Sequence, residues 1–199
     1  MARTKGITEA GSRRRTQILH GAEALIEAAG FDDLTMEAIA ESIDVAKSTL
    51  YHYFPQKEDM LFAIYEETME MQTTNLRVIV ESGKPVKEQL RLAILDQLWL
   101  IAEHPGRVRV LMDTRRDKER FYRAEMAKLE RAYLDALAAL LKRGMTSGEF
   151  RTANPVVVAE AILGMTQHSR YWLHPERPGG YKGVAKELWQ LLCDGLNPA

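Results

Sequence analysis

The chain has 199 residues, of which 46% are hydrophobic, so it is long and apolar enough to bury a sizeable core, and we do not expect a disordered protein. Its formal net charge is −1, so any attraction to nucleic acid must come from the local placement of charge and not from the sum. A single cysteine, Cys193, excludes an internal disulfide framework, and we interpret it as a small buried residue rather than a redox group.

Helical spacing of apolar residues dominates the chain, and almost no run alternates apolar with polar residues as a strand would. The sequence therefore predicts an all-α protein of nine helices. The first predicted helix ends at Gly30, which supplies a C-terminal stop. Its inner stripe consists of Ile18, Ala22, Leu25, Ile26 and Ala29.

The second and third predicted helices are short and are separated by a tight turn at 43–45. The second begins after Thr35, a favourable N-cap, and the third runs from about Lys47 to Phe54 before Pro55. With the first helix covering them, they form a helix-turn-helix unit. The inner side of the third helix is predicted to carry Ala46, Leu50, Tyr53 and Phe54. Its outward side offers a cation, hydroxyls and polar rings to the phosphates and base edges of double-stranded DNA: Lys47, Ser48, Thr49, Tyr51 and His52.

Six further helices follow, separated by proline and glycine. Their predicted limits are about 57–81, 86–103, 107–112, 118–143, 155–165 and 183–192. The segment from Pro155 through Met165 is apolar on nearly every side, so we expect that helix to be buried all round.

Two stretches, 34–40 (LTMEAIA) and 45–61 (VAKSTLYHYFPQKEDML), resemble the signature of the TetR family of transcription regulators. The resemblance implies a DNA-binding domain over 1–57 and a ligand-binding and dimerisation domain over 58–199. It also implies that Thr35 and Lys57 bind phosphates while the outward residues of the third helix lie in or beside the major groove. Independently, Thr35 and Lys57 stand at helix N-termini, where backbone N–H groups and the helix dipole favour an anion.

Two residues depart from that family's pattern. Asp44 stands in the turn where glycine is usual, and Ala46 stands where a serine usually caps the third helix. Aspartate tolerates a left-handed backbone better than most residues, so we expect the turn to survive. Losing the cap is expected to weaken the third helix by about 1 kcal/mol without abolishing DNA binding.

The N-terminal arm is basic and is expected to be mobile in the free protein: Arg3, Lys5, Arg13, Arg14 and Arg15 accompany a single acid, Glu9. It is either a solubilising tail or a contact to the DNA backbone or minor groove. We favour the contact because a helix-turn-helix follows directly. The first three predicted helices, called the DNA unit below, also carry acidic residues. These are expected to face away from the duplex: Glu23, Glu27, Asp32, Asp33, Glu37 and Glu41.

The helix-turn-helix unit of one chain, the reading unit, contacts few bases. We therefore expect a homodimer that binds a near-palindromic operator, because two units are needed for sequence specificity. The last two helices carry more apolar surface than one chain covers, and in the TetR family they pair as a four-helix bundle. The predicted interface residues are Val158, Ile162, Val184, Leu188, Leu191 and Leu192.

The remaining helices mix large apolar side chains with polar tips, and each of these taken singly is ordinary core. As a group they predict a pocket for a small amphipathic effector: Trp99, Met112, Arg115, Tyr122, Met126, Tyr133, Met165, His168, Arg170 and Trp172. The segments 148–151, 161–165, 170–172 and 177–180 are similar to a TetR subgroup that senses acyl-CoA thioesters. That similarity favours an acyl-CoA effector, with a neutral hydrophobic compound next.

The TetR resemblance also implies a mechanism. An effector in the pocket moves the long fourth helix, which is rooted in the DNA unit by Met60, Leu61 and Ile64. The shift changes the separation of the two recognition helices from roughly 34–36 Å, and DNA is released. Repression is the family's usual mode and is our expectation.

Other classes of protein have little support. We find no phosphate-cradling glycine loop, GxSxG, HExxH or CxxC motif, so we expect no enzyme, no cofactor and no metal site. A helical protein-interaction module that has lost DNA binding remains the alternative, supported by Asp44, Ala46 and the near-neutral charge. The longest apolar run, 156–165, is too short for a membrane span, so we expect a cytoplasmic protein without membrane contact.

Overall fold

The computed structural model describes residues 9–30, 34–113, 122–174 and 178–196. Within them the chain forms helices and no strand, which confirms the all-α prediction. The elements are α1 (Glu9–Ala29), α2 (Met36–Ser42), α3 (Lys47–Tyr53), α4 (Lys57–Glu81), α5 (Val86–Glu103), α6 (Pro105–Asp113), α7 (Arg123–Thr146), α8 (Pro155–His168), the 3₁₀ helix η1 (Ser169–Tyr171) and α9 (Gly180–Leu196).

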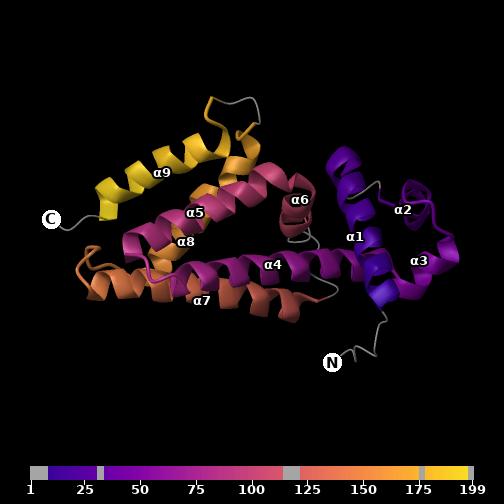
Figure 1. Cartoon of the computed structure of the whole chain (residues 1–199), viewed down its shortest axis with the longest axis horizontal. Helices are drawn as coiled ribbons and strands as arrows, with labels where there is room; N and C mark the ends of the chain where they lie inside the picture. The colour runs from indigo at the N-terminus through magenta and orange to yellow at the C-terminus, as the bar shows by residue number, and fades with distance from the viewer. Residues whose placement is uncertain (1–8, 31–33, 114–121, 175–177, 197–199) are drawn as a thin grey trace.

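The molecule is elongated, with α1, α2 and α3 gathered at one end (Figure 1). The 25-residue α4 leaves this end and runs along the long axis beside α7. The other helices build a second layer, in which α9 packs on α5 while α8 packs against both α7 and α5. α4 is thus the element that reaches from the N-terminal helices into the body of the protein.

The turn between α2 and α3 forms as predicted. Asp44 adopts the left-handed backbone conformation, with φ of 51°, and the amide of Val45 donates to the carbonyl of Ala40 at 3.0 Å. The inner side of α3 is anchored by Leu50 and Phe54, which are buried, while Tyr53 is half-buried. Ala46 was wrongly assigned to this side: it is the N-cap residue, is exposed and makes no side-chain cap bond.

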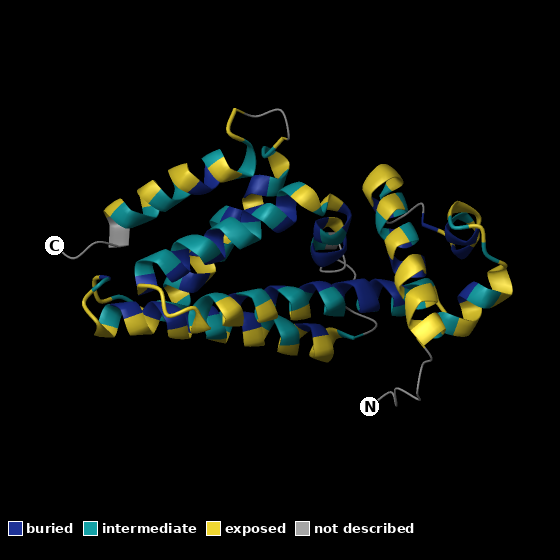
Figure 2. Ribbon diagram, in the orientation of Figure 1, coloured by how far each residue is buried: buried dark blue, intermediate teal, exposed yellow. Residues whose placement is uncertain are grey.

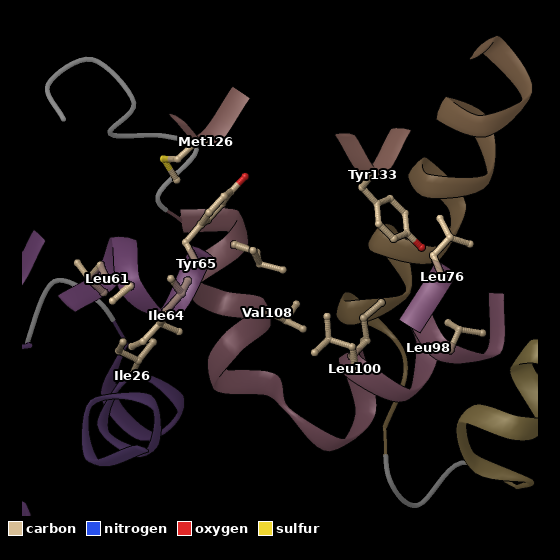
Figure 3. Packing of buried hydrophobic residues seen from close by; sticks show 14 of the residues in the cluster. Ile26, Leu61, Ile64, Tyr65, Leu76, Leu98, Leu100, Val108, Met126 and Tyr133 are labelled. Atoms are coloured by element: carbon tan, nitrogen blue, oxygen red, sulfur yellow. The ribbon is translucent and has the colours of Figure 1, made fainter. Parts of the chain in front are cut away.

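The N-terminal helices are joined to the body by the first turns of α4. Met60, Leu61 and Ile64 are fully buried there, and Ile26 of α1 lies in the same apolar cluster (Figure 3). Figure 2 shows the resulting dark stretch of α4 where it meets α1. These residues confirm the predicted root of α4, and the core runs without interruption across residue 57, so the division at 57/58 remains a prediction.

A second joint is formed by α6, which packs closely on α1. A Cβ at Gly106 would lie 2.5 Å from the backbone oxygen of Glu23, so the two helices approach as near as a glycine allows. Arg107 forms a 2.9 Å ion pair with the carboxylate of Glu23, and both side chains are largely buried. Arg109 donates to the carbonyl oxygens of Ile26 at 2.8 Å and Glu27 at 3.1 Å.

Two predicted helices differ from the structure. The helix expected from Lys118 begins at Arg123, because Tyr122 has a left-handed backbone with φ of 59° that a helix cannot continue through; residues 118–121 lie outside the described residues. The helix from Pro155 was expected to be buried all round. Within one chain only Ala159, Ile162 and Thr166 of α8 are buried, since α8 packs inward along one side only.

Candidate nucleic-acid interface and ligand cavity

The outward side of α3 is the candidate DNA-reading surface. Lys47, Ser48, Tyr51 and His52 are exposed, and Thr49 is half-buried. The exposed fraction of Tyr51 is 43%, large for an aromatic ring on a short helix. The structure therefore brings the predicted reading residues together on one side of α3, with a hydroxyl, a cation and two polar rings turned to solvent.

Lys47 is engaged by an acid within this surface. Its ammonium group forms an ion pair with Glu37 of α2 and lies 6.0 Å from the ring centroid of Tyr51. Glu37 was expected to face away from DNA and instead lies beside the reading surface. The geometry of the helix-turn-helix explains the error, because the start of α3 lies against the first turn of α2.

Thr35 and Lys57, the two predicted phosphate ligands, are brought close together. The Thr35 hydroxyl accepts from the amide of Ala38 at 3.1 Å and so caps α2. The Lys57 Nζ donates to the carbonyl oxygen of Leu34, one residue before Thr35, at 3.4 Å. A cation and a helix start therefore lie side by side, an arrangement that favours a phosphate.

Arg13, Arg14 and Arg15 are helical and not part of a mobile arm, because α1 begins at Glu9. Arg13 pairs with Glu9 at 3.0 Å, and Arg14 donates to Gln17 at 2.8 Å, both on the surface of α1. Arg15 forms an ion pair with Glu67 of α4 and lies over the ring of Phe54. Arg3 and Lys5 lie outside the described residues.

An inner cavity of about 290 Å³ lies within the body of the protein. Five helices contribute its lining: Tyr65, Met69 and Gln72 from α4; Gln97, Leu100 and Ile101 from α5; Val108, Leu111 and Met112 from α6; Glu130, Tyr133 and Leu134 from α7; Glu160, Leu163, Gly164 and Gln167 from α8. Most of these side chains are apolar, as expected of a site for a hydrophobic ligand.

The polar groups of the inner cavity are amides, hydroxyls and carboxylates. The Gln97 amide nitrogen donates to the Tyr133 hydroxyl at 2.7 Å and also to Gln72. The Tyr65 hydroxyl donates to Glu130 at 2.8 Å. Burial raises the pKa of Tyr133 well above its usual range, so its phenol stays protonated. No lysine, arginine or histidine lines this cavity within the described residues, so it suits an uncharged group better than an anion.

A second cavity, the groove, has a volume of about 720 Å³ and lies where α1, α5, α6, η1 and α9 meet. It is lined by Glu27, Ile101, Ala102, Glu103, Pro105, Val108, Arg109, Arg170, Tyr171, Leu173, His174, Gly180 and Tyr181. Ile101 and Val108 also line the inner cavity, so the two spaces are neighbours. Unlike the inner cavity, the groove carries cationic side chains.

Few of the predicted pocket residues line these spaces. Met112 and Tyr133 line the inner cavity, and Arg170 lines the groove. Trp172 contributes instead to a separate hollow against α9. Arg115 lies outside the described residues. The remaining five line neither space: Trp99, Tyr122, Met126, Met165 and His168.

Four of these five have other contacts, and the centroid of the His168 ring lies 5.3 Å from that of the Tyr171 ring. The Trp99 ring packs edge-on against His104, at 4.8 Å between centroids. Tyr122 stacks on Phe62 and donates to Asp59 at 2.5 Å, and Met126 is buried in the core (Figure 3). Sequence reasoning missed Tyr65, Gln72 and Gln97. A signal was present, since Gln72 follows Ile64 and Thr68 at four-residue spacing and so lies on the buried side of α4.

The predicted dimer residues fall into two groups. Ile162 and Val184 are 2% and 6% exposed in the single chain, so they belong to its core and were wrongly assigned to an interface. Val158, Leu188 and Leu192 are half-buried, and Leu191 is 64% exposed. Val157, which was not predicted, is 58% exposed on α8. Together, these half-buried and exposed residues form an apolar surface on α8 and α9 that one chain does not cover: Val157, Val158, Leu188, Leu191 and Leu192.

The described residues hold no group of three or more His, Cys, Asp or Glu side chains placed to bind a metal ion. Among the helices in the same part of the chain, none is both long and apolar enough to cross a lipid bilayer.

Two family models match the chain. Residues 18–64 match the bacterial regulatory proteins of the tetR family, and residues 83–196 match the tetracyclin repressor-like C-terminal domain. The fatty acid metabolism regulator protein of Bacillus subtilis (strain 168) is 25% identical over 183 residues, covering 91% of this chain and 94% of its own. The HTH-type transcriptional repressor KstR2 of Rhodococcus jostii (strain RHA1) is 27% identical over 197 residues, covering 95% and 94%.

Among solved structures, that of AibR in complex with isovaleryl coenzyme A and operator DNA superposes with a TM-score of 0.79. It is 24% identical and covers 89% of this chain and 97% of its own, a likeness that concerns the fold. One of the two relatives named above is a transcriptional repressor and the other a regulator of fatty acid metabolism, which favours the DNA-reading prediction over the enzyme and interaction-module classes.

Proposed function

The chain belongs to the TetR family of bacterial regulatory proteins, and from this membership we propose that it is a homodimeric repressor, released from double-stranded operator DNA by an acyl-CoA thioester. The observation that carries the proposal is the path of α4. Its first turns, with Met60, Leu61 and Ile64, are packed into the DNA unit, while Tyr65, Met69 and Gln72 further along line the inner cavity. A ligand in the cavity therefore touches the same rigid helix that holds the reading unit.

In this proposal the exposed side of α3 enters the major groove, and Thr35 and Lys57 hold a backbone phosphate beside it. Arg13 and Arg14, exposed on the first turns of α1, contribute further backbone contacts. Arg15 is held by Glu67, so its contact with DNA requires that ion pair to open. Because bacterial operators lie in the cytoplasm, we place the protein there.

The homodimer is supported by the uncovered apolar surface on α8 and α9. Val157 and Leu191 are more than half exposed, and Val158, Leu188 and Leu192 are half-buried. A second copy pairing on this surface bundles four helices and places two α3 helices on successive turns of a near-palindromic operator.

The acyl-CoA effector is supported by two independent facts. Among the described residues the inner cavity has mostly apolar walls and no cationic side chain, which suits a neutral acyl chain better than a free carboxylate. AibR, with a similar fold, was solved with isovaleryl coenzyme A and operator DNA, and one relative regulates fatty acid metabolism. The acyl part of the thioester would contact the amides of Gln72 and Gln97, and the ligand would act by favouring the conformation that does not bind DNA.

The test is fluorescence anisotropy with labelled DNA flanking the protein's own gene, at two salt concentrations, with and without a panel of acyl-CoA thioesters. We expect selective, salt-sensitive binding that at least one thioester abolishes. Lys57→Met should weaken binding to all sequences and reduce the salt slope by about 1, whereas Lys142→Met, exposed at the far end of α7, should change neither.

Selective binding that no thioester alters would remove acyl-CoA as the effector and leave the repressor. Failure to bind this DNA, followed by failure in an unbiased selection from random duplexes, would contradict the repressor itself.

A further inference from the structure

The amide nitrogen of Gln72, in the inner cavity, has no hydrogen-bond partner among the described residues. We propose that Gln72 and Tyr133 recognise a keto oxygen within the acyl chain, so that the effector is an oxo-acyl thioester and not a saturated one. The inference rests on the proposed function, because it specifies the acyl group of the same ligand.

The surroundings of Gln72 leave it a free donor. Its side chain is only 2% exposed. Its amide oxygen accepts from the amide nitrogen of Gln97, which leaves its own nitrogen as the unpaired end of the group. A buried N–H group without an acceptor costs free energy, and native proteins leave very few such groups unpaired. Because Gln72 lines the cavity, a ligand that enters can bring the missing acceptor.

Tyr133 supplies a second donor at the same place. Its ring is 4% exposed and extends from α7 into the apolar core (Figure 3). Its hydroxyl oxygen accepts from the Gln97 amide nitrogen at 2.7 Å, and its proton has no acceptor among the described residues. Because burial raises the pKa of Tyr133 well above its usual range, the phenol keeps that proton. One nitrogen of Gln97 contacts both residues, so the two free donors lie close together.

The charges of the cavity decide which acceptor fits these donors. A carboxylate is repelled by Glu130 and Glu160, and no cation among the described lining residues offsets that repulsion. An ammonium group suits the two acids but has no lone pair to offer to Gln72 or Tyr133. A keto oxygen is uncharged, has two lone pairs and brings no proton of its own, so it can accept from both donors.

The burial of the two donors favours an oxygen in the acyl chain over the oxygen of the thioester. Coenzyme A is too large for a cavity of about 290 Å³, so the thioester must stand at its edge. Lining residues at such an edge are exposed, as Glu160 and Gly164 of α8 are. Gln72 and Tyr133 are almost fully buried instead, so they meet the part of the ligand that enters deepest, which is the acyl chain.

The experiment is isothermal titration of the full chain with acyl-CoA thioesters of equal chain length: the saturated chain, and chains with a keto group at successive carbons. We expect at least one oxo-acyl-CoA to bind roughly tenfold more tightly than the saturated one, because only the keto oxygen satisfies the buried donors. Gln72→Met keeps the length of the side chain and removes its donor. In this variant the preference should disappear, while the affinity for the saturated chain stays the same or rises.

Two further variants complete the set. Tyr133→Phe removes the second donor but leaves the contact between Gln72 and Gln97, and it should reduce the preference by roughly threefold. Gln17→Met, exposed on α1, is the matched control and should keep the wild-type preference. Circular dichroism checks the fold of each variant. The preference is a ratio of two affinities in one preparation, so a loss of folded protein does not change it.

Three results would count against the inference. Equal affinity of the wild-type chain for the saturated and all oxo-acyl chains would overturn it and leave an acyl effector in place. Equal weakening of the saturated and oxo-acyl chains in Gln72→Met would also overturn it, because Gln72 would then bind the thioester oxygen that all of them share. If the wild-type chain binds no thioester, the proposed function fails and this inference fails with it. One set of titrations therefore distinguishes these failures.

Discussion

The two ends of α4 are built differently. At its start, Met60, Leu61 and Ile64 are at most 1% exposed and lie in a purely apolar cluster with α1. Further along, the same buried side carries Gln72, and Asn75 donates to Asp96 of α5 at 2.9 Å. Burial raises the pKa of Asp96, while the hydrogen bond from Asn75 opposes that change. Close apolar packing transmits displacement rigidly, whereas hydrogen bonds can exchange partners when a ligand enters. The start of α4 is therefore built as a rigid joint, and the part around Gln72 is built to respond to a ligand.

The largest expected effect is at the apolar end. Ile64→Ala should lower the free energy of unfolding by about 2–5 kcal/mol, because it removes a fully buried side chain between α1 and α4. Denaturant unfolding measures this. Val78→Ala, on the same helix but 61% exposed, is the control and should stay within about 0.5 kcal/mol of wild type. Equal losses at the two positions would contradict the view that the start of α4 is a packed joint.

A smaller effect is expected where α6 supports that joint. Gly106→Ala places a methyl group 2.5 Å from the backbone oxygen of Glu23, so α6 must move off α1, at a cost of about 1–3 kcal/mol. The same change at Gly164, in the middle of α8, meets nothing within 4 Å and should stabilise the chain by about 0.5–1 kcal/mol through helix propensity. Thermal unfolding of both variants gives the comparison, and a neutral Gly106→Ala would show that α6 is not tightly seated.

At the polar end, Tyr133→Phe should cost only about 1 kcal/mol or less, because Gln97 loses one acceptor but still donates to Gln72. Its effect should appear instead in the affinity for thioesters, since Tyr133 lines the inner cavity. Unfolding and ligand titration on one preparation separate the two readouts. A loss of stability as large as that of Ile64→Ala would erase the distinction between the two ends.

The smallest effect concerns a polar contact near the apolar end, between Tyr122 and Asp59. The hydrogen bond to Asp59 is the main cause that raises the pKa of Tyr122 from 10.0 to about 12. Because the folded-state pKa is the higher one, the stability from this contact is complete below pH 10 and is lost as the pH rises toward 12. Alkaline absorbance titration of wild type and Tyr122→Phe should differ by one late-titrating phenol. If the phenol that disappears in Tyr122→Phe instead titrates at an ordinary pKa, the contact between Tyr122 and Asp59 is contradicted.

The sequence predicted the DNA unit and the root of α4 in detail, because both depend on local rules. The left-handed turn at Asp44, the cap at Thr35 and the buried Ile64 follow from residue type and helical spacing. The residues that line the cavity were predicted poorly. Periodicity shows which side of a helix faces inward, but it does not show where the inward side chains of five helices leave a gap between them. Trp99 illustrates this: its size suggested a pocket wall, but it packs on His104.

Charges were the other source of error. No apolar stripe accompanies Arg13, Arg14 and Arg15, so nothing in the pattern marked them as helical. The pairing of Arg15 with Glu67 joins positions 52 residues apart. Such long-range pairs depend on how helices are brought together, and helical spacing carries no information about them.

The length of α4 has a mechanical consequence. From Gln72 at the cavity to Lys57 at the edge of the reading unit, the helix rises about 22 Å, so a tilt of about 5° at the cavity displaces the far end by about 2 Å. In a two-fold pair the two displacements are opposite and sum to about 4 Å, against the roughly 34–36 Å between successive turns of the duplex. A ligand that shifts α4 at the cavity by less than the width of one methyl group would thus move the DNA-reading helices by a larger distance. That larger movement decides whether the two helices still fit the duplex.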